Sequence, residues 1–326
     1  MGRRKIRWYR RFMPFKRRLS RVYLRDRKTP LWLVIKKLIV EIDKDDIIPS
    51  ANAVAFNFTL SVFPAIIFLF TLIPYFPIED LDTKILELMS QVLPGTIYRE
   101  FSTTINDIVS RPRGGLLSLG FVLAFYAATN GMMSLMTAFN RAYRTLDRRS
   151  FLKTRLIATA LTSLLVFALV IAVVVVIVGN VVLAWLVRHD IWGFLNDDIT
   201  YFLISTLQYG VTFALFFVAI SIIYYWAPAI HKRWGFFSVG SVTAAILCIL
   251  VTHFFSYYIS NFASYNRLYG SIGTVIGLML WFFLLSFIIL FGFEINACID
   301  EAKRETLAKA QRKAPDKKPQ MGQAGK

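Results

Sequence analysis

The sequence predicts an all-α, polytopic membrane protein with six transmembrane helices and short amphipathic helices at both membrane faces. Three observations support this fold class. Of the 326 residues, 56% are hydrophobic. Six stretches lack Asp, Glu, Lys and Arg, and each exceeds the roughly 20 residues that a helix needs to cross a bilayer. Connections that are rich in Lys and Arg alternate along the chain with connections that contain few of them. The stretches are 47–78, 114–140, 156–187, 199–230, 234–266 and 268–293.

Residues 1–30 form a basic arm in which Trp8, Tyr9, Phe12 and Phe15 are interleaved with Arg and Lys. A short apolar region with a small-residue cleavage site is absent, so we expect no removable signal peptide. We expect the arm to bind anionic headgroups of membrane lipids. Nucleic-acid binding is not expected, because topology accounts for much of the formal charge of +18.

Residues 31–48 combine apolar side chains at helical spacing with Lys, Glu and Asp, which predicts an amphipathic helix before the first span. Such a helix lies in the membrane interface, or it packs as a soluble helix on the cytoplasmic loops. The pattern leaves both alternatives open.

The first extracytoplasmic loop is the only long one. Apolar residues recur at helical spacing on both sides of Pro94 and Gly95, and acidic residues outnumber basic ones. We therefore predict two short amphipathic helices that cap the outer face over residues 79–112.

The distribution of charge predicts the topology. Most of the 38 Lys and Arg residues fall in the N-terminal arm, the second and fourth loops and the C-terminal tail. This bias places both termini in the cytoplasm and leaves 31–300 as the transmembrane domain. The tail, residues 301–326, is charged and ends in a segment rich in Lys, Pro, Gln and Gly, so we expect it to be disordered.

Polar residues share one helical face in the first, second, fourth and fifth spans. Polar side chains are costly in lipid, so they face the bundle interior or water. We predict that they line a polar cavity; the alternative is that they only form hydrogen bonds between helices. The third span is purely apolar between Leu164 and Val178 and is expected to face lipid. The candidate lining residues are Asn57, Ser61, Asn130, Ser134, Gln208, Thr212, His253 and Tyr257.

Proline and glycine residues mark candidate hinges or packing positions. Pro64 lies on the same stripe as Asn57, and a proline inside a helix removes a hydrogen bond and kinks the helix. Gly270, Gly273 and Gly277 share one face of the sixth span and let another helix approach closely. A packing role and a moving surface remain alternative interpretations.

Two titratable residues are candidate proton or ion sites. His253 lies near mid-depth, where a histidine serves in a proton relay or as a hydrogen-bonded structural residue. Glu294, at the cytoplasmic boundary, either binds a proton or cationic group or pairs with Arg141, Arg144 or Arg155. We predict no catalytic residues, no metal site and no cofactor, because no nucleophile–base pair or cluster of metal ligands stands out.

The motif at 269–277, followed by residues 294–297, is similar to the YihY/BrkB family of bacterial inner-membrane proteins. Supporting motifs lie at 59–64, 140–143 and 224–228, and the resemblance covers roughly residues 40–300. It implies six transmembrane helices in a bacterial cytoplasmic membrane, without a settled activity. Members have been labelled virulence-associated factors, transporters and, formerly, a tRNA-processing ribonuclease.

Two classes of function follow from these patterns. The first is a transporter or flippase-like exporter that moves an amphipathic or envelope-related substrate through a polar interior. The second is a non-transporting scaffold that organises lipids or envelope proteins. An enzyme is not expected, and the former ribonuclease label lacks support because His189, His231 and His253 lie too far apart to form a metal site.

Overall fold

The computed structural model describes residues 29–44, 47–75, 112–143, 145–188, 197–230, 234–261 and 263–313. These residues form seven α-helices, a short 3₁₀-helix and their connections. The N-terminal arm up to residue 28 and nearly all of the predicted outer cap, 79–112, lie outside the described residues.

Each of the six predicted spans coincides with an α-helix, which confirms the all-α polytopic architecture. Among the described residues, five helices are long and apolar enough to cross a membrane, and α9 contributes a shorter apolar stretch over Gly210–Trp226. The six helices are α4 (Ile47–Leu72), α7 (Gly114–Ala142), α8 (Phe151–Arg188), α9 (Asp197–Trp226), α10 (Val239–Asn261) and α11 (Ala263–Lys313). A 3₁₀-helix, η1 (Ile73–Tyr75), extends α4.

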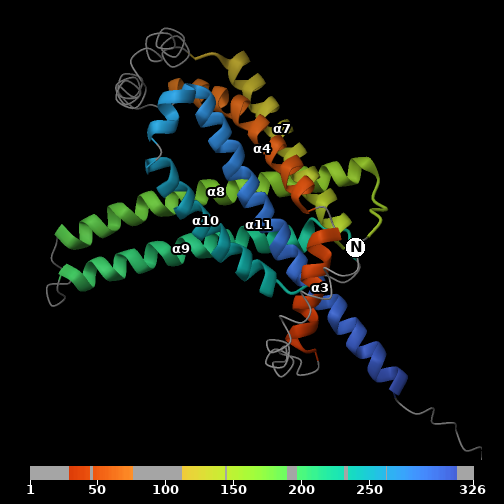
Figure 1. Ribbon diagram of the computed structural model, residues 1–326. Coiled ribbons are helices and arrows are strands. Elements are labelled where there is room, and N and C mark those ends of the chain that lie inside the picture. The colour runs from red at the N-terminus through yellow and green to blue at the C-terminus, as the bar shows by residue number, and fades with distance from the viewer. Residues whose placement is uncertain are drawn as a thin grey trace, which may run out of the picture.

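The spans meet at one end of the bundle. Helix α4 packs along both α7 and α11, α10 packs along α11 and contacts α9, and α8 contacts α7 and α9. In Figure 1, α4 and α7 run together to the top, whereas α8 and α9 run to the left, so these two pairs diverge. We call the end where they converge the basic end, because the α7–α8 connection there carries Arg141, Arg148 and Arg149.

The buried core lies at the basic end. The rings of Phe139 on α7 and Phe293 on α11 stack with centroids 4.2 Å apart. Tyr224 on α9 packs edge-on against both rings, and its hydroxyl donates to the Ile289 carbonyl at 2.6 Å. One aromatic cluster therefore joins α7, α9 and α11.

The amphipathic helix predicted before the first span is α3 (Leu31–Lys44), and it packs on α11. Val34 is 4% exposed and packs with Cys298 and Ala302. Burial lowers the pKa of the Lys37 ammonium, but hydrogen bonds to Glu301 and Glu305 outweigh this effect and raise its pKa. Helix α3 is therefore fixed to α11, and its place in the membrane interface or on the cytoplasmic loops stays a prediction.

The C-terminal tail requires a correction. We expected residues 301–326 to be disordered, but α11 continues as a helix through Lys313. Ion pairs one turn apart support this extension, Arg304 with Asp300 at 3.0 Å and Lys309 with Glu305 at 2.7 Å. Residues 314–326 lie outside the described residues.

Close approach of helices depends on glycines that differ from those singled out in the sequence. A Cβ atom on Gly240 would overlap the Gly292 carbonyl oxygen and come within 2.7 Å of the Asn296 side chain. A Cβ atom on Gly292 would lie 2.6 Å from the Tyr224 hydroxyl. Gly273, from the predicted set, is buried, Gly277 is half-buried, and the surroundings of Gly270 are outside the described side chains.

We predict that Gly240→Ala destabilises the protein, because the added methyl group forces α10 and α11 apart where their backbones touch. Overpacking of this kind costs about 1–3 kcal/mol. Thermal unfolding in detergent should show a lower Tm for this variant. Gly210→Ala is the control, because a Cβ atom there meets nothing within 4 Å. Equal Tm values for the two variants would contradict the close packing.

Candidate functional site

Two of the predicted lining residues meet directly. The Asn57 Nδ2 atom on α4 donates to the Ser134 hydroxyl on α7 at 3.0 Å and to the Ala53 carbonyl at 2.8 Å. Ser61, one turn further along α4, donates to the Phe58 carbonyl of its own helix. One hydrogen bond therefore links the polar faces of the first two spans, and this is a contact of the kind that the sequence offers as the alternative to a cavity.

Asn130 also has a partner, although one from an unexpected helix. Its Oδ1 atom accepts a hydrogen bond of 2.5 Å from Arg155 Nη1, and the same nitrogen donates to the Met133 sulfur at 3.1 Å. The guanidinium carbon lies 4.4 Å from the centre of the Tyr126 ring, which is a cation–π contact. Arg155, on α8, is thus held against the middle of α7. We call this group the Arg155 site.

The other lining candidates belong to α9 and α10. His253 and Tyr257 lie on exposed parts of α10, and Thr212 is half-buried on α9. The Gln208 side chain is outside the described side chains. Pro64 is inside α4 and half-buried. A shared cavity lined by four spans therefore stays a prediction.

A second group of polar residues lies at the basic end and coincides with the family motifs at 140–143, 224–228 and 294–297. Asn140 is buried at the end of α7. Its Nδ2 atom donates to Asp147 at 3.0 Å, and its Oδ1 atom accepts from the Ala229 backbone N–H at 2.7 Å. Arg149 donates to the Ala227 carbonyl at 3.2 Å. The α7–α8 connection is therefore tied to the segment that follows α9.

Asn296 makes the matching connection between α11 and α10. Its Oδ1 atom accepts from the Gly240 backbone N–H at 2.8 Å, and its Nδ2 atom donates to the Ser238 hydroxyl at 2.9 Å. Because the first N–H groups of a helix have no partner within the helix, Asn296 acts as a cap for α10 supplied by another helix. The Asn140 and Asn296 contacts together close the basic end. We call them the basic-end ties.

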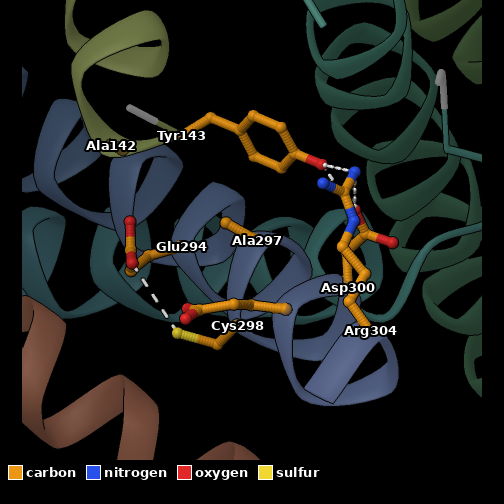
Figure 2. Close-up of a pocket in the computed structure, with 8 residues that line it drawn as sticks. Ala142, Tyr143, Glu294, Ala297, Cys298, Asp300 and Arg304 are labelled. Carbon is orange, nitrogen blue, oxygen red and sulfur yellow. Dashed lines mark hydrogen bonds and ion pairs between the residues drawn. The ribbon is translucent and has the colours of Figure 1, made fainter. Parts of the chain in front are cut away.

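A cavity of about 150 Å³ lies beside these ties. In Figure 2, Tyr143 reaches from the end of α7 towards Asp300 and Arg304 on α11. Its hydroxyl donates to Asp300 Oδ2 at 2.5 Å and accepts from Arg304 at 2.7 Å. Burial, reinforced by the hydrogen bond to Asp300, raises the pKa of Tyr143 to about 12. Its hydroxyl therefore stays protonated at physiological pH and keeps donating to the carboxylate.

Glu294 lines the same cavity and is 1% exposed. Its Oε1 atom accepts from the Cys298 thiol at 3.6 Å, as Figure 2 shows. The sequence offers three arginines as partners of Glu294. Of these, Arg155 binds Asn130 instead, Arg141 is exposed, and Arg144 lies outside the described residues. In the described part of the chain, no group of three or more His, Cys, Asp or Glu residues could hold a metal ion.

Comparison with known proteins identifies similar membrane proteins. The family model described as virulence factor BrkB matches residues 38–317. YfkH of Bacillus subtilis, which is named as a ribonuclease-like protein, is 33% identical over 77% of this chain and 89% of its own length. A UPF0761 membrane protein of Paraburkholderia xenovorans is 26% identical over 78% of this chain and 57% of its own length. No solved structure matches the chain.

A further relative has a similar length. The UPF0761 membrane protein of Alteromonas mediterranea is 26% identical over 83% of this chain and 90% of its own length. The two UPF0761 names describe membrane proteins without an activity. The comparisons therefore support the membrane assignment and leave the activity to be argued from the residues.

We predict that Asn140→Ala destabilises the protein by about 1–3 kcal/mol, because it leaves the partly buried Ala229 N–H without this acceptor. The measurement is the free energy of unfolding in mild detergent, followed by denaturant titration. Thr137→Ala, one turn earlier, is the matched control, because the Thr137 hydroxyl is exposed and binds only its own helix. If Asn140→Ala were as stable as this control, the Asn140 hydrogen bonds would not contribute to holding the basic end together.

Proposed function

This chain belongs to the virulence factor BrkB family of membrane proteins, and from this premise we propose that it is a transporter or flippase-like exporter. Its substrate would be an amphipathic, envelope-related molecule, and its location the bacterial cytoplasmic membrane. The positive-inside bias of the loops supports an orientation with both termini in the cytoplasm. The basic end then faces the cytoplasm.

The arrangement of the helix pairs carries this proposal. The spans converge at the basic end, where Asn140 ties α7 to the segment after α9 and Asn296 ties α11 to α10. Away from that end, the α4–α7 pair diverges from the α8–α9 pair (Figure 1). A bundle that is tied at one end and spread at the other has the asymmetry of one state in an alternating-access cycle. In the opposite state, the basic-end ties would break and the substrate would leave or enter from that side.

The ties have the strength that a reversible gate requires. Hydrogen bonds between membrane helices contribute only about 0.6 kcal/mol each on average. A few such bonds hold one state without preventing the other. Pro64, inside α4, and the Gly270, Gly273 and Gly277 face of α11 are the proposed hinge or sliding positions.

The energy source is proposed to be an ion gradient or the gradient of the substrate. His253 and Glu294 are the candidate proton-binding residues. Glu294 supports this role best, because it lies next to the Asn296 tie and lines the cavity at the basic end. Protonation of this buried carboxyl group would change the charge beside the contacts that close the basic end.

The proposal predicts lipid movement in proteoliposomes. Reconstituted protein should accelerate the transfer of fluorescent phospholipid between leaflets, measured by quenching with dithionite, over protein-free vesicles. Asn57→Leu should slow this transfer several-fold, because it removes a polar group between α4 and α7. Identical rates with and without protein would contradict the proposal. A non-transporting scaffold would give the same phenotype for Asn57→Leu and wild type in cells but would fail when residues 3–28 are deleted.

A further inference from the structure

Arg155 places its positive charge beside the middle of α7, a helix long and apolar enough to cross a membrane. Its guanidinium contacts Tyr126 and Asn130, which lie on either side of Ala128, the midpoint of α7. Along the helix, Asn130 is about 15 Å from Asn140 at the basic end, at 1.5 Å of rise per residue. Arg155 lies near the start of α8, and its half-buried side chain packs against α7.

Among the residues that the structure describes, no carboxylate forms an ion pair with Arg155. Its contacts are the neutral Asn130 carbonyl oxygen, the Met133 sulfur and the Tyr126 ring. Arg has five N–H donors, and these contacts use one nitrogen. Charged residues inside membranes are costly and mark functional sites, so an anion is the missing partner.

The face of α7 that leads to Arg155 is apolar and uncovered. Leu119, Val122, Tyr126, Asn130 and Met133 follow one another at spacings of three or four residues, so they form one stripe on the helix. Leu119, Val122 and Tyr126 are 55%, 59% and 58% exposed. Asn130 and Met133, at the end of the stripe, are half-buried beneath Arg155. An uncovered apolar stripe therefore ends at a positive charge.

We propose that the Arg155 site binds an anionic phospholipid, with the lipid phosphate on the Arg155 guanidinium and one acyl chain along Leu119 and Val122. The planar guanidinium forms paired hydrogen bonds to phosphate oxygens, which an ammonium group does not. The Asn130 and Tyr126 contacts hold the guanidinium in position before the lipid arrives. One part of this inference rests on the proposed function, namely that the bound lipid is the transported substrate or resembles it.

The test measures lipid binding to the full-length protein in mild detergent by native mass spectrometry. The probes are phosphatidylglycerol and phosphatidylcholine with identical acyl chains. Wild-type protein should bind the first phosphatidylglycerol about tenfold more tightly than phosphatidylcholine, a difference of about 1.4 kcal/mol. Arg155→Gln should abolish the preference by weakening only phosphatidylglycerol binding. Lys153→Gln, two residues away with an exposed side chain, should keep it.

A second variant separates loss of binding from loss of folding. Asn130→Asp places a carboxylate within hydrogen-bonding distance of the guanidinium, so it neutralises Arg155 while strengthening the α7–α8 contact. This variant should unfold at or above the wild-type temperature and still lose the preference for phosphatidylglycerol. Retention of that preference in both Arg155→Gln and Asn130→Asp would overturn the proposal.

A competition experiment identifies the source of the phosphate. Millimolar glycerol 3-phosphate should not displace phosphatidylglycerol, because it lacks the acyl chain that follows the α7 stripe. Displacement at that concentration would overturn the assignment to a lipid. Binding and transport can fail separately: selective phosphatidylglycerol binding without leaflet transfer refutes only the proposed function. Leaflet transfer without any effect of Arg155→Gln on binding refutes only the Arg155 site.

Discussion

The structure depends on one constraint: polar groups that lie within a membrane must find partners inside the protein. The six spanning helices carry few such groups in their apolar stretches, and several of these groups join two helices. Asn57 forms a hydrogen bond with Ser134, Asn130 with Arg155, and Asn140 with the Ala229 backbone. Asn296 caps α10. The apolar remainder of each helix packs on its neighbours or faces the surroundings. Polar contacts therefore define the register of the bundle, and aromatic packing around Phe139 fills its core.

The distribution of these contacts gives the bundle its asymmetry. At the basic end, side-chain hydrogen bonds join segments that are far apart in the sequence, and the tightest backbone contact, Gly240 against Gly292, lies there too. Asn140 and Asn296, which lie in two of the motifs that resemble the family, make several of these bonds. We interpret the motifs at 140–143 and 294–297 as parts of a gate, rather than as a reaction centre. Tyr143, Asp300 and Arg304 add a charged contact at the margin of the gate.

The sequence predicts the spans well and their partners poorly. An uncharged stretch of sufficient length identifies a span by itself, and the helical periodicity of Asn57 and Ser134 indicates a polar face. Periodicity does not say which face meets which, so the sequence offers Arg155 as one of three possible partners of Glu294, whereas its side chain binds Asn130. Gly240 and Gly292 do not belong to a series of glycines at helical spacing, so the sequence does not reveal them as packing positions. The helical extension to Lys313 could have been found from the Asp300–Arg304 and Glu305–Lys309 spacing.

A distance measurement across the basic end tests most directly whether this end opens. Spin labels at Arg141→Cys and Phe237→Cys occupy exposed positions on either side of the basic-end ties, whereas the native Cys248 and Cys298 are buried. Pulsed electron resonance in lipid nanodiscs should give two distance populations, and Asn140→Ala should increase the longer one. One narrow distance, unchanged by Asn140→Ala, would contradict a gate and favour a rigid membrane scaffold.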